Sequence, residues 1–355
     1  MQFRSKLILA LLAIVIIAFV VINVFPSKDV ILRYKDIIKT PTLNTNLPYG
    51  KSLDIAFNED KLSIYDSIVV RKDNEVLGKL IDQFSMTVNT SSYLLGYHKL
   101  EVSIYKNGKA RTIDLPFIIV SDIVPSQILF SKIKTITHDA KSYTQGFEIH
   151  NNIFYESSGQ YGASSIRKTN IKNRQVITEK KLDPSYFAEG LTVMNGKVYQ
   201  LTWKEGQCII YDEDLKELKK IGFRSTTGEG WGICNDGVSL ILSDGSHKLT
   251  YLHPETFAIE KVMEVFAGNT PVNYLNELEY VNGFIYANIF TTNQIAQIEA
   301  KTGKVTGVIE LSSLKNENPI GEVLNGIAYQ KSSNTFFITG KYWEKTYEIS
   351  FKEAL

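Results

Sequence analysis

A unit of 40 to 48 residues recurs through the carboxy-terminal part of the chain, and this repeat constrains the fold more than any other feature. Each copy opens with a polar residue and then a small residue or Leu. The second residues of the five copies stand at positions 146, 190, 230, 278 and 326. A repeat of this length is typical of supersecondary units that are stacked or arranged radially. The sequence therefore predicts five similar units.

Each unit is predicted to contain three or four short β-strands. The opening residues lead into an apolar run, a tight turn such as Asn195-Gly196 or Asn282-Gly283, and a second apolar run. Asn-Gly between alternating apolar runs is a strong hairpin signal. Because no helical period interrupts the strands, residues 125–355 are predicted to form an all-β, five-bladed β-propeller. A plain β-sandwich is the alternative, although a sandwich does not repeat its turn chemistry at a fixed step.

The fifth unit is shorter than the others, so its sheet needs a strand from elsewhere. Residues 128–137 alternate apolar and polar side chains and precede the first repeat. Pairing of this segment with the last unit closes the ring and protects the sheet edges. Residues 128–137 are therefore predicted to be the outer strand of the last blade.

The amino-terminal segment Leu7 to Phe25 contains 19 uncharged residues and follows Arg4 and Lys6. This length just crosses a hydrocarbon core of about 30 Å. Residues 1–26 are therefore predicted to form a membrane anchor helix, with the rest of the chain outside the cytoplasm, on the periplasmic or extracellular side. A cleaved signal peptide, giving a secreted protein, is the alternative, but its apolar region is normally about 7–15 residues.

Residues 27–124 do not carry the repeat. They contain short alternating runs, including residues 62–70 and 98–105, separated by turn signals such as Asn107-Gly108. This pattern suits a small antiparallel sandwich of immunoglobulin type. The predicted order is thus an anchor, an immunoglobulin-like β-sandwich and a propeller.

Composition narrows the classes of function. With 39 basic and 38 acidic residues the net charge is +1, which gives no sign of nucleic-acid binding. The two cysteines, Cys208 and Cys234, are too few for a disulfide framework, and they are either a single pair or two buried free thiols. A monomer is the default expectation.

In a propeller the equivalent positions of different blades converge at the central channel. Three carboxylates that converge in this way repel one another unless they are protonated, solvated or bridged by a cation. A structural Ca²⁺ in the channel is one expectation, and a water-filled polar channel is the alternative. The convergent residues are Gln145, Glu189, Glu229, Asn276, Glu277 and Asn325.

A second set of residues lies at the end of the second predicted strand of each repeated unit. Aromatic and polar side chains together at such ends are typical of an enclosed small-ligand site, in which a carboxyl group has a raised pKa. Packing between blades is the alternative interpretation. The set is Phe154, Glu156, Trp203, Asp244, Asn288, Phe290 and Lys341.

From about residue 130 to the end, the chain resembles the plant and bacterial type of glutaminyl cyclases (glutaminyl-peptide cyclotransferases). The resemblance rests on several motifs that occur in the family's order. They are Tyr143-Thr144-Gln145-Gly146-Phe147, Tyr155-Glu156-Ser157-Ser158-Gly159, Glu189-Gly190-Leu191-Thr192, Leu201-Thr202-Trp203, Gly230-Trp231-Gly232, Ser243-Asp244-Gly245, Asn276-Glu277-Leu278-Glu279, Asn325-Gly326-Ile327 and Thr339-Gly340-Lys341.

The resemblance implies conversion of an N-terminal glutaminyl residue of a peptide or protein to pyroglutamate, with release of ammonia. It implies that Glu156 is the proton shuttle and that Gln145, Asn276 and Lys341 orient the substrate or stabilise charge. Tyr143, Phe154, Trp203 and Phe290 are the implied pocket walls, although the family more often has Trp at the position of Phe290. From the convergent set, Glu189, Glu277 and Asn325 are further candidates for substrate binding.

The residue types agree with this chemistry. The amine of the substrate attacks its own γ-amide carbon, so no enzyme nucleophile is required. The five His residues show no zinc-ligand spacing, so no metal or other cofactor is expected for the reaction. A non-catalytic propeller that binds peptide or glycan remains an alternative, as does a Ca²⁺-dependent propeller hydrolase of the lactonase kind.

Overall fold

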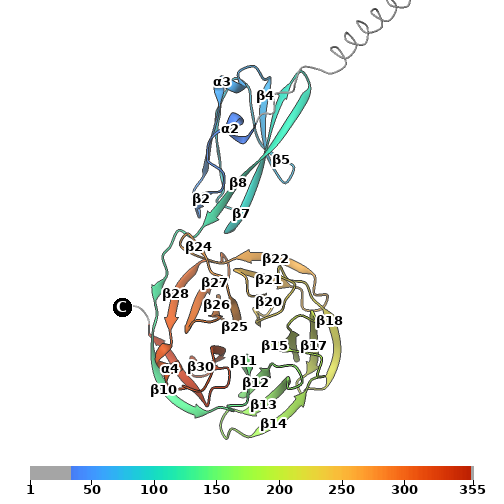
Figure 1. Ribbon diagram of the computed structural model, residues 1–355, viewed down its shortest axis with the longest axis vertical. Helices are drawn as coiled ribbons and strands as arrows, with labels where there is room; N and C mark the ends of the chain where they lie inside the picture. The colour runs from blue at the N-terminus through green and yellow to red at the C-terminus, as the bar shows by residue number, and fades with distance from the viewer. Residues whose placement is uncertain (1–32, 353–355) are drawn as a thin grey trace, which may run out of the picture. The chain divides into compact units, whose positions relative to one another are not determined.

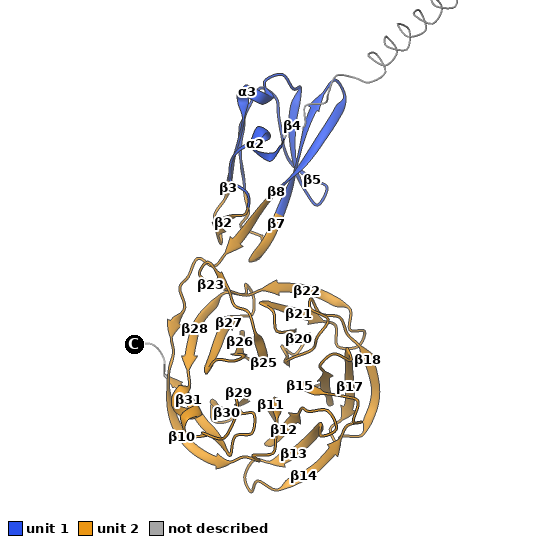
Figure 2. Cartoon of the chain, in the orientation of Figure 1, with its two compact units in different colours: residues 1–43, 54–88, 99–115 blue, residues 44–53, 89–98, 116–355 orange. Residues whose placement is uncertain are grey.

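The computed structural model describes residues 33–352. These residues belong to two compact units, coloured separately in Figure 2. The predicted anchor over residues 1–26 lies outside the described residues, and no helix within residues 33–352 is long and apolar enough to span a membrane. Among the described residues, the first unit comprises residues 33–43, 54–88 and 99–115, and the second comprises residues 44–53, 89–98 and 116–352.

The strands before residue 121 form a three-stranded sheet, in the order β1-β3-β6, and a five-stranded sheet, in the order β2-β8-β7-β4-β5. Their apolar side chains alternate between buried and more exposed positions; in β7, for example, Leu100, Val102 and Ile104 are buried. The immunoglobulin-like assignment of residues 27–124 stays a prediction. The elements are α2 (Tyr34–Ile37), β1 (Ile38–Thr40), β2 (Thr45–Pro48), β3 (Leu53–Phe57), α3 (Glu59–Leu62), β4 (Ser67–Lys72), β5 (Glu75–Leu80), β6 (Ser85–Val88), β7 (Gly96–Lys106) and β8 (Lys109–Val120).

The rest of the second unit is all-β, with one short helix among the described residues, α4 (Ser312–Asn316). Its first three sheets each consist of four strands that follow one another in the chain and pair in antiparallel order. They are β11 (Thr144–His150), β12 (Ile153–Ser158), β13 (Ser165–Asn170) and β14 (Val176–Lys181); β15 (Ala188–Met194), β16 (Lys197–Thr202), β17 (Gln207–Asp212) and β18 (Glu217–Gly222); and β19 (Ile233–Asn235), β20 (Leu240–Ser243), β21 (Lys248–Leu252) and β22 (Ile259–Glu264).

The fourth and fifth sheets each contain a strand from before the first repeat. The fourth sheet ends with the short strand β9, which pairs in parallel with β28. A small hairpin of β23 (Phe266–Ala267) and β24 (Thr270–Pro271) precedes this sheet. The strands are β25 (Leu275–Val281), β26 (Phe284–Ile289), β27 (Gln294–Glu299), β28 (Val305–Glu310) and β9 (Ser126–Gln127); and β29 (Leu324–Gln330), β30 (Thr335–Gly340), β31 (Lys345–Lys352) and β10 (Leu129–Thr137).

The pairing of β10 with β31 confirms the predicted outer strand of the last sheet. The two strands are antiparallel, with Phe130 opposite Phe351 and Thr137 opposite Lys345. The chain therefore closes on itself through a sheet that contains strands from both ends of the repeat region. Figures 1 and 2 show the five sheets around a common centre, with β11, β15, β25 and β29 innermost.

The hairpin turns follow the predicted chemistry. Between β15 and β16, Asn195 and Gly196 have φ values of 50° and 71°, and Asn282 and Gly283 between β25 and β26 have values of 49° and 88°. Two consecutive positive φ angles define the type I′ turn, which Asn-Gly adopts with little strain. The Asn-Gly pairs that mark the hairpins in the sequence therefore adopt the backbone conformation that the turns require.

Three glycines at or beside the start of the inner strands, Gly146, Gly190 and Gly232, allow neighbouring sheets to touch backbone to backbone. A Cβ on Gly146 would lie 2.3 Å from the Leu191 amide nitrogen, and one on Gly232 would lie 2.0 Å from the Asn276 carbonyl oxygen. Such contacts exclude any side chain at these positions. The repeated glycines thus set how closely neighbouring sheets approach at the centre.

A register shift at the start of four inner strands, β11, β15, β25 and β29, takes the polar residue of the motif out of regular pairing. The shifts fall between Thr144 and Gly146, and between Ala188 and Leu191, and equivalent shifts occur in β25 and β29. Bulges of this kind re-aim side chains and are frequent beside active sites. They place Gln145, Glu189, Asn276 and Asn325 at irregular backbone positions instead of within regular pairing.

The apolar core lies between adjacent sheets. One buried cluster joins Ile241 and Leu249 of the third sheet to Leu278, Ile285 and other residues of the fourth. Cys208 and Cys234 are buried, unpaired thiols, which decides between the two states predicted for them. A packed apolar core therefore supports the ends of the inner strands, where the polar residues of the motifs lie.

Candidate active site

A pocket of about 240 Å³ opens where the bulged ends of the inner strands meet. Drug-sized ligands occupy pockets of about 300–1,000 Å³, so this pocket suits a single amino-acid side chain with adjoining backbone. All five sheets contribute to it, through residues within the inner strands or beside the strand ends. The lining residues are Tyr143, Gln145, Gln160, Phe187, Glu189, Trp203, Trp231, Asn276, Phe290 and Lys341.

Aromatic rings form the walls and contact one another edge to face. The Phe187 ring lies 5.5 Å from that of Trp203 and 6.1 Å from that of Tyr143, and the Trp231 and Phe290 rings are 5.5 Å apart. Such pairs add rigidity beyond the burial of their area. The walls are therefore suited to hold a flexible side chain in one conformation.

The polar groups of the pocket are almost completely buried. Glu189 is 5% exposed and Lys341 is 3% exposed. The Lys341 ammonium lies over two aromatic faces, 4.5 Å from the centre of the Tyr143 ring and 4.9 Å from that of Phe290. These cation–π contacts fix the ammonium without neutralising it. The pocket therefore contains one carboxyl group and one amine inside an apolar wall.

Burial changes the pKa of both groups toward the neutral range. Burial raises the pKa of Glu189 well above its ordinary value, Glu229 and Glu205 raise it further, and Lys341 opposes the shift. Burial lowers the pKa of Lys341 to about 8, against the attraction of Glu189 and Glu322. A carboxyl group and an amine that titrate closer to neutrality are fitted to proton transfer and charge stabilisation.

Asn325 lies behind the pocket and orients one of its walls. Its Nδ2 donates to the Thr144 carbonyl oxygen at 2.9 Å and to Gln145 Oε1 at 3.2 Å. Gln145 in turn donates from Nε2 to Glu189 Oε1 at 2.9 Å. The structure thus places Asn325 outside the lining, in contact with Gln145, and Gln145 in contact with the pocket carboxyl group.

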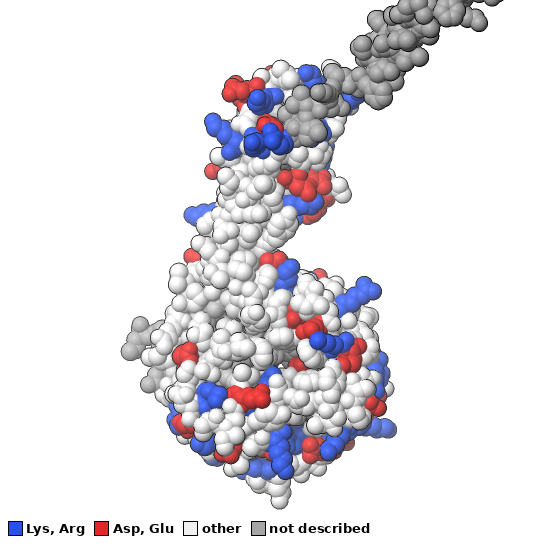
Figure 3. Space-filling model, in the orientation of Figure 1, with Lys and Arg blue, Asp and Glu red and all other residues white. Residues whose placement is uncertain are grey.

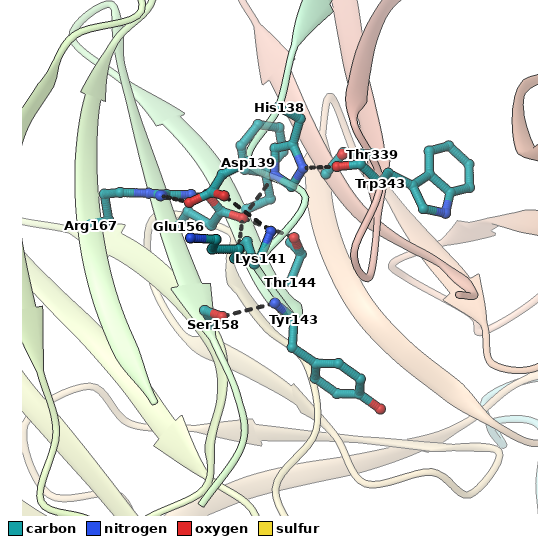
Figure 4. Close-up of polar contacts among 12 residues, drawn as sticks. His138, Asp139, Lys141, Tyr143, Thr144, Glu156, Ser158, Arg167, Thr339 and Trp343 are labelled. Atoms are coloured by element: carbon teal, nitrogen blue, oxygen red, sulfur yellow. Dashed lines mark hydrogen bonds and ion pairs between the residues drawn. The ribbon is translucent and has the colours of Figure 1, made fainter. Parts of the chain in front are cut away.

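Glu156, the predicted proton shuttle, does not line this pocket. Its Oε1 accepts hydrogen bonds from Ser142, Thr144 and His138, and its Oε2 accepts one from Arg167 Nη2 at 2.5 Å. Figure 4 shows this cluster, with the Tyr143 ring pointing away from it. Burial favours the neutral form, but His138 and Arg167 outweigh it and hold the pKa of Glu156 far below its usual range. A carboxylate in this environment suits a structural anion, and the structure places Glu156 outside the pocket, so no contact with the pocket supports its predicted role as proton shuttle.

Two other predicted residues also lie elsewhere. Phe154 stacks on Phe147 at 4.9 Å inside the core and carries the Arg174 guanidinium on its ring, so it is not a pocket wall. Glu277 accepts the backbone N–H groups of Phe147 and Ile327 and therefore joins inner strands. Neither side chain lines the pocket.

The seven other predicted site residues meet at the pocket. They are Tyr143, Gln145, Glu189, Trp203, Asn276, Phe290 and Lys341. Nothing in residues 33–352 groups three or more His, Cys, Asp or Glu side chains as a metal site would require. The buried Asn276 Oδ1 has no hydrogen-bond partner among the described residues, so it is an acceptor left open beside the pocket.

Sequence reasoning missed three lining residues: Gln160, Phe187 and Trp231. A signal for Phe187 was present, because an aromatic residue stands two positions before the polar residue in Tyr143-Thr144-Gln145 and in Phe187-Ala188-Glu189. Trp231 follows the third opening motif directly. Gln160 carried no such signal, since it lies in the loop after β12 and has a φ of 110°.

Buried proton-transfer groups inside rigid aromatic walls, at one end of an all-β ring of sheets, define an enzyme pocket for a small polar side chain. Comparison with known proteins agrees. Residues 119–351 match the family model for glutamine cyclotransferase, and the chain belongs to this family.

Two known proteins are similar to this chain. The chain is 37% identical over 224 residues to a glutaminyl-peptide cyclotransferase of Arabidopsis thaliana, covering 61% of this chain and 69% of the relative. It resembles the crystal structure of the Myxococcus xanthus glutaminyl cyclase with a TM-score of 0.60 and 32% identity, over 64% of this chain and 98% of that one.

Proposed function

We propose that this protein is a glutaminyl-peptide cyclotransferase, which converts the N-terminal glutamine of a peptide or protein to pyroglutamate and releases ammonia. The observation that carries the proposal is the buried pair Glu189 and Lys341 within an aromatic pocket of side-chain size. The family and the named relatives support the same reaction.

The pocket supplies the conformation that the reaction requires. A new bond must form between the α-amine nitrogen and the γ-carboxamide carbon of the same residue, and the bond from that carbon to the amide nitrogen must break. Trp203, Trp231 and Phe290 enclose a folded-back side chain, which brings amine and carbonyl to attack distance before any proton moves. No water enters the bond changes, so the aromatic enclosure also protects against hydrolysis.

Glu189 acts as base and then as acid. Its Oε1 is held by Gln145, so Oε2 is the oxygen free to take a proton from the attacking amine. The same proton is then delivered to the departing amide nitrogen, which leaves as ammonia. The raised pKa of Glu189 fits a group that must bind and release a proton in one turnover.

The oxygen of the attacked carbonyl gains negative charge. The Lys341 ammonium, pointed into the pocket by two aromatic faces, provides the positive charge opposite it, and Asn276 provides an amide on the neighbouring wall. A preorganised donor of this kind is worth more in a dry pocket than in water.

The wider architecture supports this assignment. We infer that the five sheets are the blades of a β-propeller with the active site at one mouth. We also propose that the chain is a monomer tethered by residues 1–26, with the catalytic unit outside the cytoplasm. Figure 3 shows acidic and basic side chains interspersed on the visible face, as suits a peptide enzyme and not a nucleic-acid partner.

The direct test is ammonia release from a Gln-initiated dipeptide by the full-length chain in detergent. Release above the spontaneous rate is expected with Gln at the amino terminus, and none with the N-acetylated dipeptide, which lacks a free amine. Mass spectrometry should show a loss of one ammonia per peptide. A folded protein that releases none refutes the proposal.

A further inference from the structure

We propose that Glu229 is the positioning residue that holds two tryptophan walls of the pocket in place and sets the charge around Glu189. Its Oε2 accepts the indole N–H of Trp203 at 2.8 Å and that of Trp231 at 2.9 Å. The role in catalysis rests on the proposed cyclisation, whereas the clamp itself does not.

The two indoles come from different sheets. Trp203 follows β16 in the second sheet, and Trp231 precedes β19 in the third. A single carboxylate oxygen therefore joins two blade ends across the pocket. Hydrogen bonds from neutral donors to a carboxylate are stronger than bonds between neutral groups. Each indole also packs edge to face on a phenylalanine, Phe187 or Phe290, so fixing the two N–H groups fixes both walls.

The loop that carries Glu229 is itself built to hold it. The backbone carbonyl oxygen of Glu229 accepts a hydrogen bond from Ser225 Oγ at 2.7 Å. Asp244, which is 2% exposed, accepts from the backbone N–H of Thr227 at 3.0 Å and from the Thr226 hydroxyl at 2.5 Å. Asp244 therefore anchors the loop and Glu229 anchors the rings, which gives a role to one residue of the predicted strand-end set.

Glu229 also acts through its charge. Glu189 is surrounded by Gln145, which donates to it, by the Lys341 cation and by the carboxylates Glu205 and Glu229. Lys341 favours the ionised form of Glu189 and the two carboxylates disfavour it. Removing the charge of Glu229 but keeping its acceptor should therefore lower the pKa of Glu189 without loosening the walls.

Two substitutions separate the two effects. Glu229→Gln keeps an oxygen acceptor and removes the charge, and Glu229→Ala removes both. Glu310→Ala is the matched control, because Glu310 accepts hydrogen bonds from Ser312 and Gln294 far along the sheet in β28 and does not line the pocket. Acrylamide quenching of tryptophan emission reads the walls directly, since the chain has three Trp and the third, Trp343, is fully buried.

In Glu229→Ala, quenching should increase and the KM should rise at least about tenfold, because both indole hydrogen bonds to the carboxylate are lost. In Glu229→Gln, quenching and KM should stay near those of the unmodified chain, while the acidic limb of kcat/KM moves to lower pH. Glu310→Ala should change neither. Unchanged quenching in Glu229→Ala, or an unmoved acidic limb in Glu229→Gln, overturns the inference.

The quenching measurement needs no substrate. If the unmodified chain releases no ammonia but Glu229→Ala still exposes the indoles, the proposed reaction fails and the clamp stands. If the chain is active and the indoles are unaffected, the clamp fails and the reaction stands.

Discussion

Gln145 donates a hydrogen bond from Nε2 to Glu189 Oε1 over 2.9 Å, although the two residues are 44 positions apart and belong to different sheets. The direction of this bond is set by Asn325, which donates to Gln145 Oε1 and leaves only the amino group of Gln145 to face Glu189. In the proposed mechanism, the carboxyl oxygen that receives this bond takes no part in proton transfer, which leaves the other oxygen, Oε2, for that step.

Replacing the hydrogen-bond donor at position 325 by an acceptor should therefore change the pKa of Glu189. Asp in Asn325→Asp cannot donate, so the Gln145 amide is expected to turn and present its oxygen to Glu189. A carbonyl oxygen facing a carboxylate favours the protonated form. The acidic limb of kcat/KM should move to higher pH, measured with a Gln-initiated dipeptide.

Asn318→Asp is the control for that experiment. Asn318 is equally buried, and its Nδ2 likewise donates to one backbone oxygen, of Leu314, and one side-chain oxygen, of Tyr347. It should lower stability without moving the pH profile. If both variants shift the acidic limb of kcat/KM, or if neither variant does, Asn325 does not act through Gln145.

Substitution by Gln should have different effects on kcat at Glu189 and at Glu156. Glu189→Gln removes the acid and base and should lower kcat by about 10²- to 10⁴-fold. Glu156→Gln should leave kcat per folded molecule unchanged, because Glu156 faces His138 and Arg167 and not the pocket. Steady-state kinetics normalised to folded protein by circular dichroism decides between them, and a collapse of kcat only in Glu156→Gln would restore the original assignment.

The Glu156 cluster should instead govern stability. Losing one partner of a buried ion pair costs about 3–5 kcal/mol, so Glu156→Gln should lower the free energy of unfolding by roughly that amount. Because the folded-state pKa lies below the unfolded value near 4.5, the stabilisation is present above pH 4.5 and is lost as the pH falls through the folded pKa. The free energies of unfolding of the variant and the parent, measured by urea titration from pH 7 downward, should converge in acid. A difference that stays constant with pH would contradict this.

The rate should show a bell-shaped dependence on pH. Glu189 works ionised, and its raised pKa means that activity falls on acidification at a higher pH than for an ordinary carboxylate. Lys341 works as a cation with a pKa of about 8, so activity falls again as the pH rises through about 8. In Lys341→Met the basic limb should vanish and kcat should drop about 10²- to 10³-fold; persistence of that limb assigns it to another group.

Metal removal should not affect the reaction. The proposed steps use Glu189, Lys341 and the substrate amine alone, and the channel carboxylate Glu277 is occupied by backbone N–H groups. Dialysis against EDTA, followed by the ammonia assay, should leave the rate unchanged. A rate that is lost and then restored by Ca²⁺ would favour the hydrolase alternative.

The sequence predicted the repeat, the turns and the closing strand because each has a local cause: Asn-Gly turns, alternating apolar runs, and glycines where backbones touch. It did not predict on which side of a strand a carboxylate faces. Glu156 lies in β12 at a regular pairing position, opposite Phe147, whereas Glu189 lies in a bulge. That difference depends on pairing between strands, which motif spacing does not encode.

Because every sheet supplies at least one side chain to the pocket, and the fifth is completed only by a strand from before the first repeat, the reaction centre cannot exist in a partly assembled chain. A folded molecule with one sheet undocked is therefore expected to lack activity. Turnover should therefore report that all five sheets have docked and that the ring is closed.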